Sequence, residues 1–339
     1  HYCEPMDIDI ILNEFASAQE SAELSRLAES YGIRGIWSSS YGDGRDPFMT
    51  FALAADQTKK IQLGPLAVSP NELHPLKITN ALYSIDEMSE GRAISCIGGG
   101  GGVIQHMGFK RDRIIAHLRE CLEVMNGVSA DKTINYKGEL YKAWNYRLAW
   151  AGNNRPQIYV ASNWPQTMRL ATKMADGLMT SDFCPKLMAQ RIEEIYAELD
   201  KNNRPRDKFK ISNFWAWHIK EDADASWFEA KRELLLRGYL GEQYFAPFLE
   251  PDELKCMRDH FDDFLSAWKK GSDQIDNVPD SLVTKMIENI SFVGGLDAID
   301  DAVRTLQEFA DMGVTEIALR VHDEPEDAIR LIGELVVPK

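Results

Sequence analysis

The chain has 339 residues, of which 44% are hydrophobic and 27% are charged, and its formal net charge is −15. This length suits a single α/β barrel, which takes about 250 residues and more when it carries insertions. Because no basic stripe offsets the negative charge, we exclude nucleic acid and anionic membrane surfaces as partners. A well-solvated cytoplasmic surface is the simplest account of the charge.

The five cysteines are scattered and contain no CxxC pair, which predicts reduced thiols rather than disulfides. The histidines show no HxxxH spacing, so we predict no metal site. No apolar stretch approaches the roughly 18 residues of a membrane span, and a signal-peptide pattern is missing. We therefore expect a cytoplasmic protein that does not enter a membrane. Residues 1–5 are expected to be a tag or an N-terminal extension, followed by one domain over residues 6–339.

Apolar, strand-like runs alternate with helical patterns along most of the chain. Eight strands are expected, at residues 8–12, 35–38, 61–68, 93–97, 157–161, 177–180, 209–219 and 315–321. Helices are expected at residues 18–31, 47–58, 75–88, 111–125, from 165 onward, 185–199, 296–312 and 326–336, with a hairpin at 133–146. This alternation predicts a (β/α)₈ barrel, the TIM-barrel fold. Residues 223–289 hold helical patterns with no strand between them, which predicts a helical insertion after the seventh strand.

The fourth expected strand runs into five consecutive glycines, residues 98–102. Glycines at the end of a buried strand let the backbone come close to a flat or phosphorylated ligand. The run does not fit the G-x-G-x-x-G pattern and does not follow the first strand of the chain. Both facts disfavour a dinucleotide-binding fold.

Barrel enzymes place their ligand sites at the carboxyl ends of the strands. Asp9, within the first strand, is either a desolvated carboxyl that acts as a general acid or a member of an ordinary salt bridge. After the fifth strand, free helix amides and the hydroxyls of Ser162 and Thr167 suit a phosphate, although plain helix capping uses the same residue types.

Several motifs together resemble the bacterial-luciferase-like superfamily. Within that superfamily the chain looks most like the branch that holds methylenetetrahydromethanopterin reductase, which uses the deazaflavin coenzyme F420. The motifs that carry the resemblance lie at residues 63–70, 74–75, 86–93, 97–100, 136–141, 158–177 and 292–314.

The resemblance implies a TIM barrel that binds a flavin or deazaflavin at its C-terminal mouth, and it also implies a homodimer. Asp9 falls where the reductase has a glutamate that looks like its proton donor, with Asn13 or Ser40 orienting the substrate. A bulge on strand three would support the ring of the cofactor at Leu66 and Ala67. The other residues expected to bind the cofactor are Ser39, Ser40, Val68, Gly98, Gly99, Gly100, Ala161, Ser162, Asn163, Trp164 and Thr167.

Three functions are compatible with this resemblance. The first is hydride transfer between reduced F420, or a flavin, and a small organic substrate. The second is a reduced-FMN-dependent monooxygenase. Many family members carry Asp-His or Glu-His where this chain has Ser39 and Ser40, and some carry a glutamate at Gly101. These departures leave a third possibility, a flavin-binding protein without catalysis. The aromatic residues of the insertion either shape the substrate pocket or pack the insertion onto the barrel.

Overall fold

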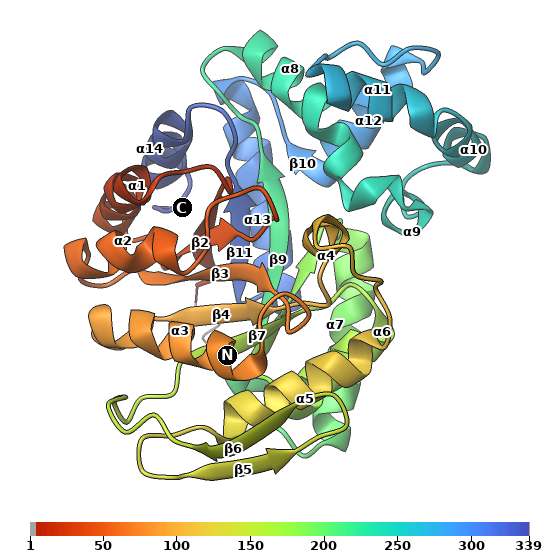
Figure 1. Ribbon diagram of the computed structural model, residues 1–339. Coiled ribbons are helices and arrows are strands. Elements are labelled where there is room, and N and C mark those ends of the chain that lie inside the picture. Colours follow the sequence, from red (N-terminus) through yellow and green to blue (C-terminus); the bar gives the residue numbers. More distant parts are fainter. Residues whose placement is uncertain (1–4, 339) are drawn as a thin grey trace.

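Eight parallel strands close into a barrel in the computed structural model, which describes residues 5–338 (Figure 1). Each strand pairs with the next, β9 pairs with both β8 and β11, and β11 pairs with β1. The predicted TIM barrel is confirmed. Its strands in order are β1 (Asp7–Leu12), β2 (Gly35–Ser39), β3 (Gln62–Val68), β4 (Ile94–Ile97), β7 (Gln157–Ala161), β8 (Gly177–Ser181), β9 (Lys210–Trp217) and β11 (Glu316–Arg320).

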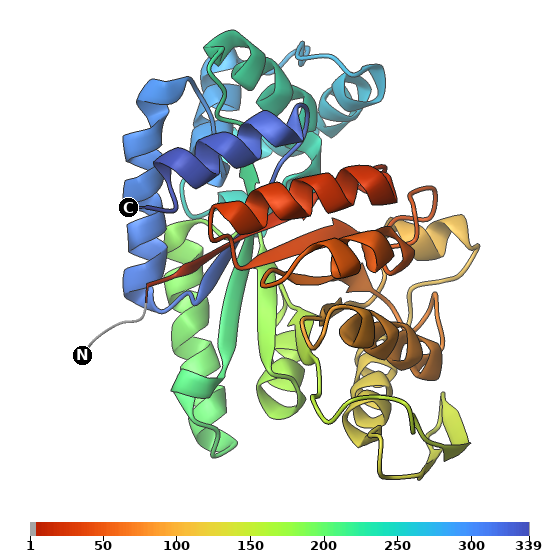
Figure 2. The ribbon, with the colours of Figure 1, turned by 90° about the vertical axis from the view of Figure 1, so that its left-hand side faces the viewer.

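Helices cover the outside of the barrel, and Figure 2 shows two of them, α1 and α14, side by side although they lie at opposite ends of the chain. Two of these helices begin at a side-chain cap: Ser17 accepts a hydrogen bond from the backbone of Glu20, and His74 accepts one from the backbone of Leu76. The outer helices are α1 (Ala18–Ser30), α2 (Ala52–Gln57), α3 (Pro75–Met88), α5 (Ile114–Gly127), α6 (Pro165–Met174), α7 (Pro185–Lys201), α13 (Ile299–Met312) and α14 (Pro325–Leu335).

The structure departs from the sequence prediction at three places. The glycine run leads into a short helix, α4 (Gly102–His106), so α5 begins later than expected, at Ile114. A 3₁₀ turn precedes α2, because Asp46 accepts hydrogen bonds from the backbone of the next turn. A two-residue strand, β10 (Ser291–Phe292), pairs with the end of β9. The expected hairpin is present as β5 (Ile134–Lys137) and β6 (Lys142–Tyr146).

Five helices lie between β9 and β10 and gather at one end of the barrel, beside the carboxyl end of β9 (Figure 1). Tyr244 and Phe245 are buried in the main apolar core, and Trp227 and Phe248 pack against it. Most of the aromatic residues of this segment therefore pack it onto the barrel. The helices are α8 (Ala223–Glu233), α9 (Glu242–Phe245), α10 (Pro251–Asp259), α11 (Phe261–Lys270) and α12 (Asp280–Ile290).

The inside of the barrel is layered. A charged network of Asp9, Arg34 and Glu316 fills the end where the strands begin. An apolar layer above it closes the interior, so that a ligand can enter only from the carboxyl ends of the strands. This layer contains Ile11, Trp37, Ile94, Cys96, Tyr159, Met179 and Ala318.

Two further expectations concern the chain as a whole. The four cysteines that the structure describes, Cys96, Cys121, Cys184 and Cys256, are free. Over residues 5–338, the helices lack the combination of length and apolar composition that a membrane crossing requires. Apart from Pro5, the expected extension at residues 1–5 lies outside the described residues.

Candidate active site

Strand β3 is irregular at the mouth of the barrel. Its register with β4 shifts between Leu66 and Val68, and the peptide bond between Leu66 and Ala67 is cis. A bulge places two consecutive residues on the same side of a strand. Leu66 and Ala67 both contact the apolar interior layer while staying only partly buried. They therefore face the open mouth, where the sequence predicted the support of a cofactor ring.

Gly98 lies beside this bulge. A Cβ atom at Gly98 would be 3.0 Å from the Cβ of Ala67 and 3.5 Å from the Cβ of Ala161. These three small residues therefore form a flat surface across β3, β4 and β7. We call Ala67, Gly98 and Ala161 the flat surface. Because a larger residue at position 98 would stand up from it, the surface fits the planar ring of a flavin or deazaflavin.

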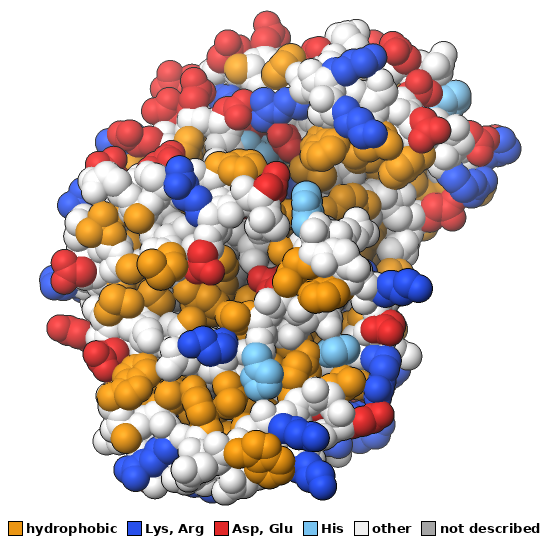
Figure 3. Space-filling view, viewed as in Figure 1, with side chains coloured by type: hydrophobic (Ala, Val, Ile, Leu, Met, Phe, Trp, Pro, Cys, Tyr) orange, Lys and Arg blue, Asp and Glu red, His pale blue; other side chains and the backbone are white. Residues whose placement is uncertain are grey.

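A groove of about 400 Å³ leads away from the next glycine, between the starts of α5 and α6. The Nη2 atom of Arg111 lies 3.6 Å from where a Cβ of Gly99 would be. Figure 3 shows Lys and Arg side chains, with Asp and Glu among them, at the edge where Figure 1 places α6. The groove suits the anionic tail of a cofactor, and sequence reasoning missed its arginines. Its lining residues are Arg111, Asp112, Arg113, Ile114, Ile115, Ala116 and Gln166.

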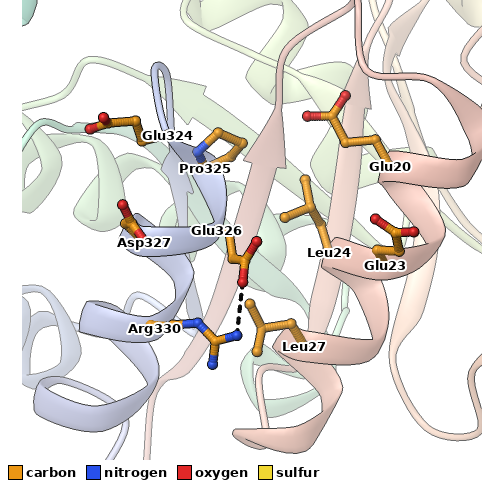
Figure 4. Close-up of a pocket in the computed structure, with 9 residues that line it drawn as sticks. All are labelled: Glu20, Glu23, Leu24, Leu27, Glu324, Pro325, Glu326, Asp327 and Arg330. Carbon is orange, nitrogen blue, oxygen red and sulfur yellow. Dashed lines mark hydrogen bonds and ion pairs between the residues drawn. The ribbon is translucent and has the colours of Figure 1, made fainter.

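A second groove, of about 590 Å³, lies outside the barrel between α1 and α14 (Figure 4). Its only basic residue, Arg330, already pairs with Glu326 at 2.8 Å. This groove repels anions and is separate from the strand ends, so it is not the site of an anionic cofactor. Its acidic residues are Glu20, Glu23, Glu324, Glu326 and Asp327.

Ser40 and Glu72 form a hydrogen-bonded pair next to the bulge. The backbone amide of Ser40 donates to the carbonyl of Leu66 at 3.1 Å, and its hydroxyl donates to Oε1 of Glu72 at 2.9 Å. The other carboxyl oxygen, Oε2, is buried and has no hydrogen-bond partner among the described residues. Burial raises the pKa of Glu72, and the Ser40 hydrogen bond offsets part of this rise. Glu72 is a candidate acid that sequence reasoning missed.

Asp9 does not reach this mouth. It pairs with Gly35, the first residue of β2, whereas Ser39 is the last residue of β2. Four strand steps separate these positions, about 13 Å. Asp9 is fully buried and accepts hydrogen bonds from Arg34 at 2.9 and 2.5 Å and from Trp37 at 3.0 Å. Of the two roles that the sequence left open, this geometry is that of a structural salt bridge.

Arg34 is the centre of that buried network. Burial alone would lower its pKa, but the carboxylates of Asp9 and Glu316 raise the pKa of Arg34 above its usual value. Tyr159 donates to Glu316 at 2.6 Å and accepts from Arg34 at 3.1 Å. The network therefore joins β1, β7, β11 and the start of β2 at the amino-terminal end of the barrel.

Four predicted residues after β7 are mostly engaged within the protein. The hydroxyls of Ser162 and Thr167 lie 3.1 Å apart, and Thr167 also donates to the carbonyl of Trp164. Asn163 donates to Ser181 and Tyr244, and its Oδ1 accepts from the backbone of Ser181. These contacts brace the turn between β7 and α6, while no side-chain hydrogen bond caps the start of α6 at Trp164. The Trp164 side chain, by contrast, is 54% exposed.

Three other predicted residues are used locally. Asn13 accepts a hydrogen bond from the backbone of Phe15, which shapes the turn after β1. Ser39 is buried against the carbonyl of Leu12 at 3.5 Å. Val68 packs into the core between the barrel and its helices. The structure thus brings Leu66, Ala67, Gly98 and Ala161 together with Ser40, and leaves these three residues out of the flat surface.

His218, Glu229 and His322 form a buried cluster next to the insertion, and their possible ligand atoms lie within 4.8 Å of one another. The Glu229 carboxylate already accepts from His218 at 2.7 Å and from the backbone of Asp323 at 2.9 Å, and it pairs with Lys220 at 3.1 Å. Burial lowers the pKa of His218, and burial together with nearby cations sets that of His322 well below its usual value. The cluster ties α8 to the ends of β9 and β11.

Fold and site together define a (β/α)₈ barrel whose mouth carries a flat surface and a neighbouring groove with arginines, features that suit a planar, anionic ligand. The chain belongs to the luciferase-like monooxygenase family, whose sequence model matches residues 6–316. The resemblance found in the sequence is thereby confirmed.

The comparisons also identify individual relatives. A 5,10-methylenetetrahydromethanopterin reductase of Archaeoglobus fulgidus is 25% identical over 319 residues, which cover 93% of each chain. The same enzyme of Methanopyrus kandleri is 23% identical over 337 residues, or 94% of this chain and 93% of the relative.

Solved structures share the fold. The coenzyme F420-dependent tetrahydromethanopterin reductase of Methanopyrus kandleri has a TM-score of 0.79 and 20% identity, covering 98% of this chain and 99% of that one. An F420-dependent secondary alcohol dehydrogenase has a TM-score of 0.78 and 16% identity, with 98% of both chains covered. The oxygenating constituent of a 3,6-diketocamphane monooxygenase from Pseudomonas putida, in complex with FMN, has a TM-score of 0.69 and 19% identity, with 99% of both chains covered.

Proposed function

We propose that the chain is an oxidoreductase that transfers hydride between reduced coenzyme F420 and a small organic substrate. The observation that carries this proposal is the flat surface of Ala67, Gly98 and Ala161 at the mouth of a barrel that is otherwise closed. The reductases similar to this chain over 93% of its length, together with the coenzyme F420-dependent reductase that shares its fold, support F420 as the cofactor. When bound, F420 supplies the hydride chemistry, and the protein supplies binding and orientation.

Different residues of the chain would bind the cofactor, exclude water and supply a proton. The flat surface would hold one face of the ring, and Arg111 would pair with the anionic tail. Leu66 and Phe214 would keep water from the ring, since both are apolar and partly exposed to the mouth. Hydride transfer to a carbonyl or imine also needs a proton. Glu72, whose pKa is raised by burial, is positioned beside the bulge to hold and donate it.

The cofactor is tested by anaerobic equilibrium titration of the purified protein with reduced F420 and with reduced FMN. We expect tighter binding of F420, and oxidation of reduced F420 when a panel of small ketones and imines is added. Tighter binding of FMN with oxygen consumption would favour the monooxygenase, which the structural likeness to an FMN-bound enzyme also allows. Binding without turnover on any substrate would favour a flavin-binding protein without catalysis.

Replacing Glu72 with glutamine tests the proton donor. Glutamine keeps the hydrogen bond with Ser40 but cannot donate a proton, so kcat should fall by about 10²- to 10⁴-fold. The wild-type rate should decline as the pH rises through the raised pKa of Glu72, because the protonated form is then lost, and the variant should lack this decline. Cofactor affinity should not change. An unchanged kcat would assign the proton to another group.

We further propose that the protein acts in the cytoplasm as a homodimer. The free thiols of the four described cysteines support a reducing compartment. Trp144 and Trp150, near the β5–β6 hairpin, are 59% and 47% exposed and support an association surface. Light scattering should give a mass of twice 38.4 kDa, and a single-chain mass would contradict the dimer.

A further inference from the structure

The side chain of Arg320 points into the barrel at its mouth, where it places a positive charge. Side chains alternate between the inside and the outside of a strand, and on β11 Glu316 and Ala318 face inward. Arg320, two residues further on, is the next inward residue and the last of β11. The residues that pair with Arg320 in register, Ile11 of β1 and Ala216 of β9, are uncharged.

The guanidinium of Arg320 is not fully used by the protein. Its side chain is only 14% exposed, and its ion pair with Oε2 of Glu14 spans 3.6 Å, which is too long for a hydrogen bond. That Oε2 atom is itself buried without a hydrogen-bond partner among the described residues. The backbone carbonyl of Val321 accepts one hydrogen bond from Arg320. The guanidinium of Arg320 therefore keeps N–H donors that can bind a ligand at the mouth of the barrel.

Arg237 reaches the same place from the insertion. Its side chain is 6% exposed, and its guanidinium lies over the ring of Phe214, the inward residue of β9, at 5.3 Å. It pairs with Asp182 at 3.1 Å, while its buried Nε has no partner within the described chain. Phe214 pairs in register with Ala318 of β11, two residues before Arg320, so Arg237 lies over the strand that neighbours Arg320. The charge of Arg237 adds to burial in lowering the pKa of Arg320.

We propose that Arg320 and Arg237 together bind a carboxylate group of the substrate. A guanidinium presents a planar pair of donors that matches a carboxylate. Glu14 and Asp182 each offset part of the positive charge, so the pair suits one negative charge better than a phosphate dianion. This inference rests on the proposed function and narrows its substrate to a small organic acid.

The position of the arginines agrees with this role. In the strand order of the barrel, β11 lies four strands from β4, which carries Gly98 at its end. A carboxylate on Arg320 would thus lie across the mouth from the flat surface. The rest of a small acid would then extend over that surface, where its reacting carbon can meet the ring.

Isothermal titration of the full-length protein tests the proposal with three acid and amide pairs: acetate and acetamide, pyruvate and pyruvamide, benzoate and benzamide. In the wild type, at least one carboxylate should bind about tenfold or more tightly than its amide. R320M and R237M should each weaken that carboxylate by about tenfold to a hundredfold and leave the amide unchanged. R304M, which removes an arginine whose side chain is 70% exposed, is the matched control.

R320K retains a positive charge but lacks the planar pair of donors, so its loss of carboxylate affinity should be smaller than that of R320M. It replaces R320M in the test if R320M folds poorly. The proposal is overturned if every amide binds as well as its acid, or if R320M and R237M bind the carboxylate like the wild type. The titrations are made with and without reduced F420. A protein that binds neither F420 nor FMN would end the proposed function, while the acid and amide comparison would still decide this inference.

Discussion

Gly98→Val is expected to weaken cofactor binding by about a hundredfold, which corresponds to about 2.8 kcal/mol. The Cβ of the new side chain would already lie 3.0 Å from the Cβ of Ala67. The two methyl groups beyond it would then rise from the flat surface into the space of the ring. Because the φ angle of Gly98 is not positive, the backbone accepts valine. Fluorescence titration with F420, or with FMN, measures the change.

Gly152→Val is the matched control, because it adds the same side chain at another glycine without a positive φ angle. A Cβ atom at Gly152 would meet no atom within 4 Å, and the residue is exposed. Its cofactor affinity should equal that of the wild type. If both variants bind equally well, the ring does not lie on Ala67, Gly98 and Ala161. Thermal unfolding of both variants shows whether the barrel itself is intact.

The barrel could be predicted from the sequence because each of its strands is a short apolar run between turn residues. Strands buried on both faces need such continuous runs. All eight lie within two residues of the expected bounds. Helix α4 could not be predicted in the same way, because it begins in a run of five glycines, the residue that disfavours helix interiors most after proline.

The irregular strand and the glycine that meet at the mouth could be located from the sequence, because one segment carries each of them, Leu66–Ala67 and Gly98. It was not predictable where its meaning depends on a distant partner. The role of Glu72 depends on Ser40, 32 residues earlier in the chain. Arg237 reaches Asp182 across 55 residues of sequence. The periodicity of a sequence indicates helices and strands, but it does not indicate which loops lie next to one another at the mouth of the barrel.

The position of Asp9 deep in the barrel could not be predicted for the same reason. Its partner Arg34 lies 25 residues away in the chain, and the register of β1 with β2 brings the two side chains together. Asp9→Asn should lower the free energy of unfolding by about 3–5 kcal/mol, the usual effect of breaking a buried ion pair. The amide would turn a donor toward the buried guanidinium of Arg34, whose other carboxylate partner, Glu316, is 3.8 Å away. Urea unfolding, followed by tryptophan fluorescence, measures the loss.

Asp200→Asn removes the same charge from an exposed pair with Arg206 and should leave the unfolding midpoint unchanged, because water screens that pair. Folded Asp9→Asn protein should still bind the cofactor within about twofold of the wild type, since the apolar layer of Ile11 and Trp37 separates position 9 from the mouth. A variant with wild-type stability but without turnover would instead return Asp9 to the role of proton donor. The two measurements therefore separate a charge that holds the barrel together from one that takes part in its chemistry.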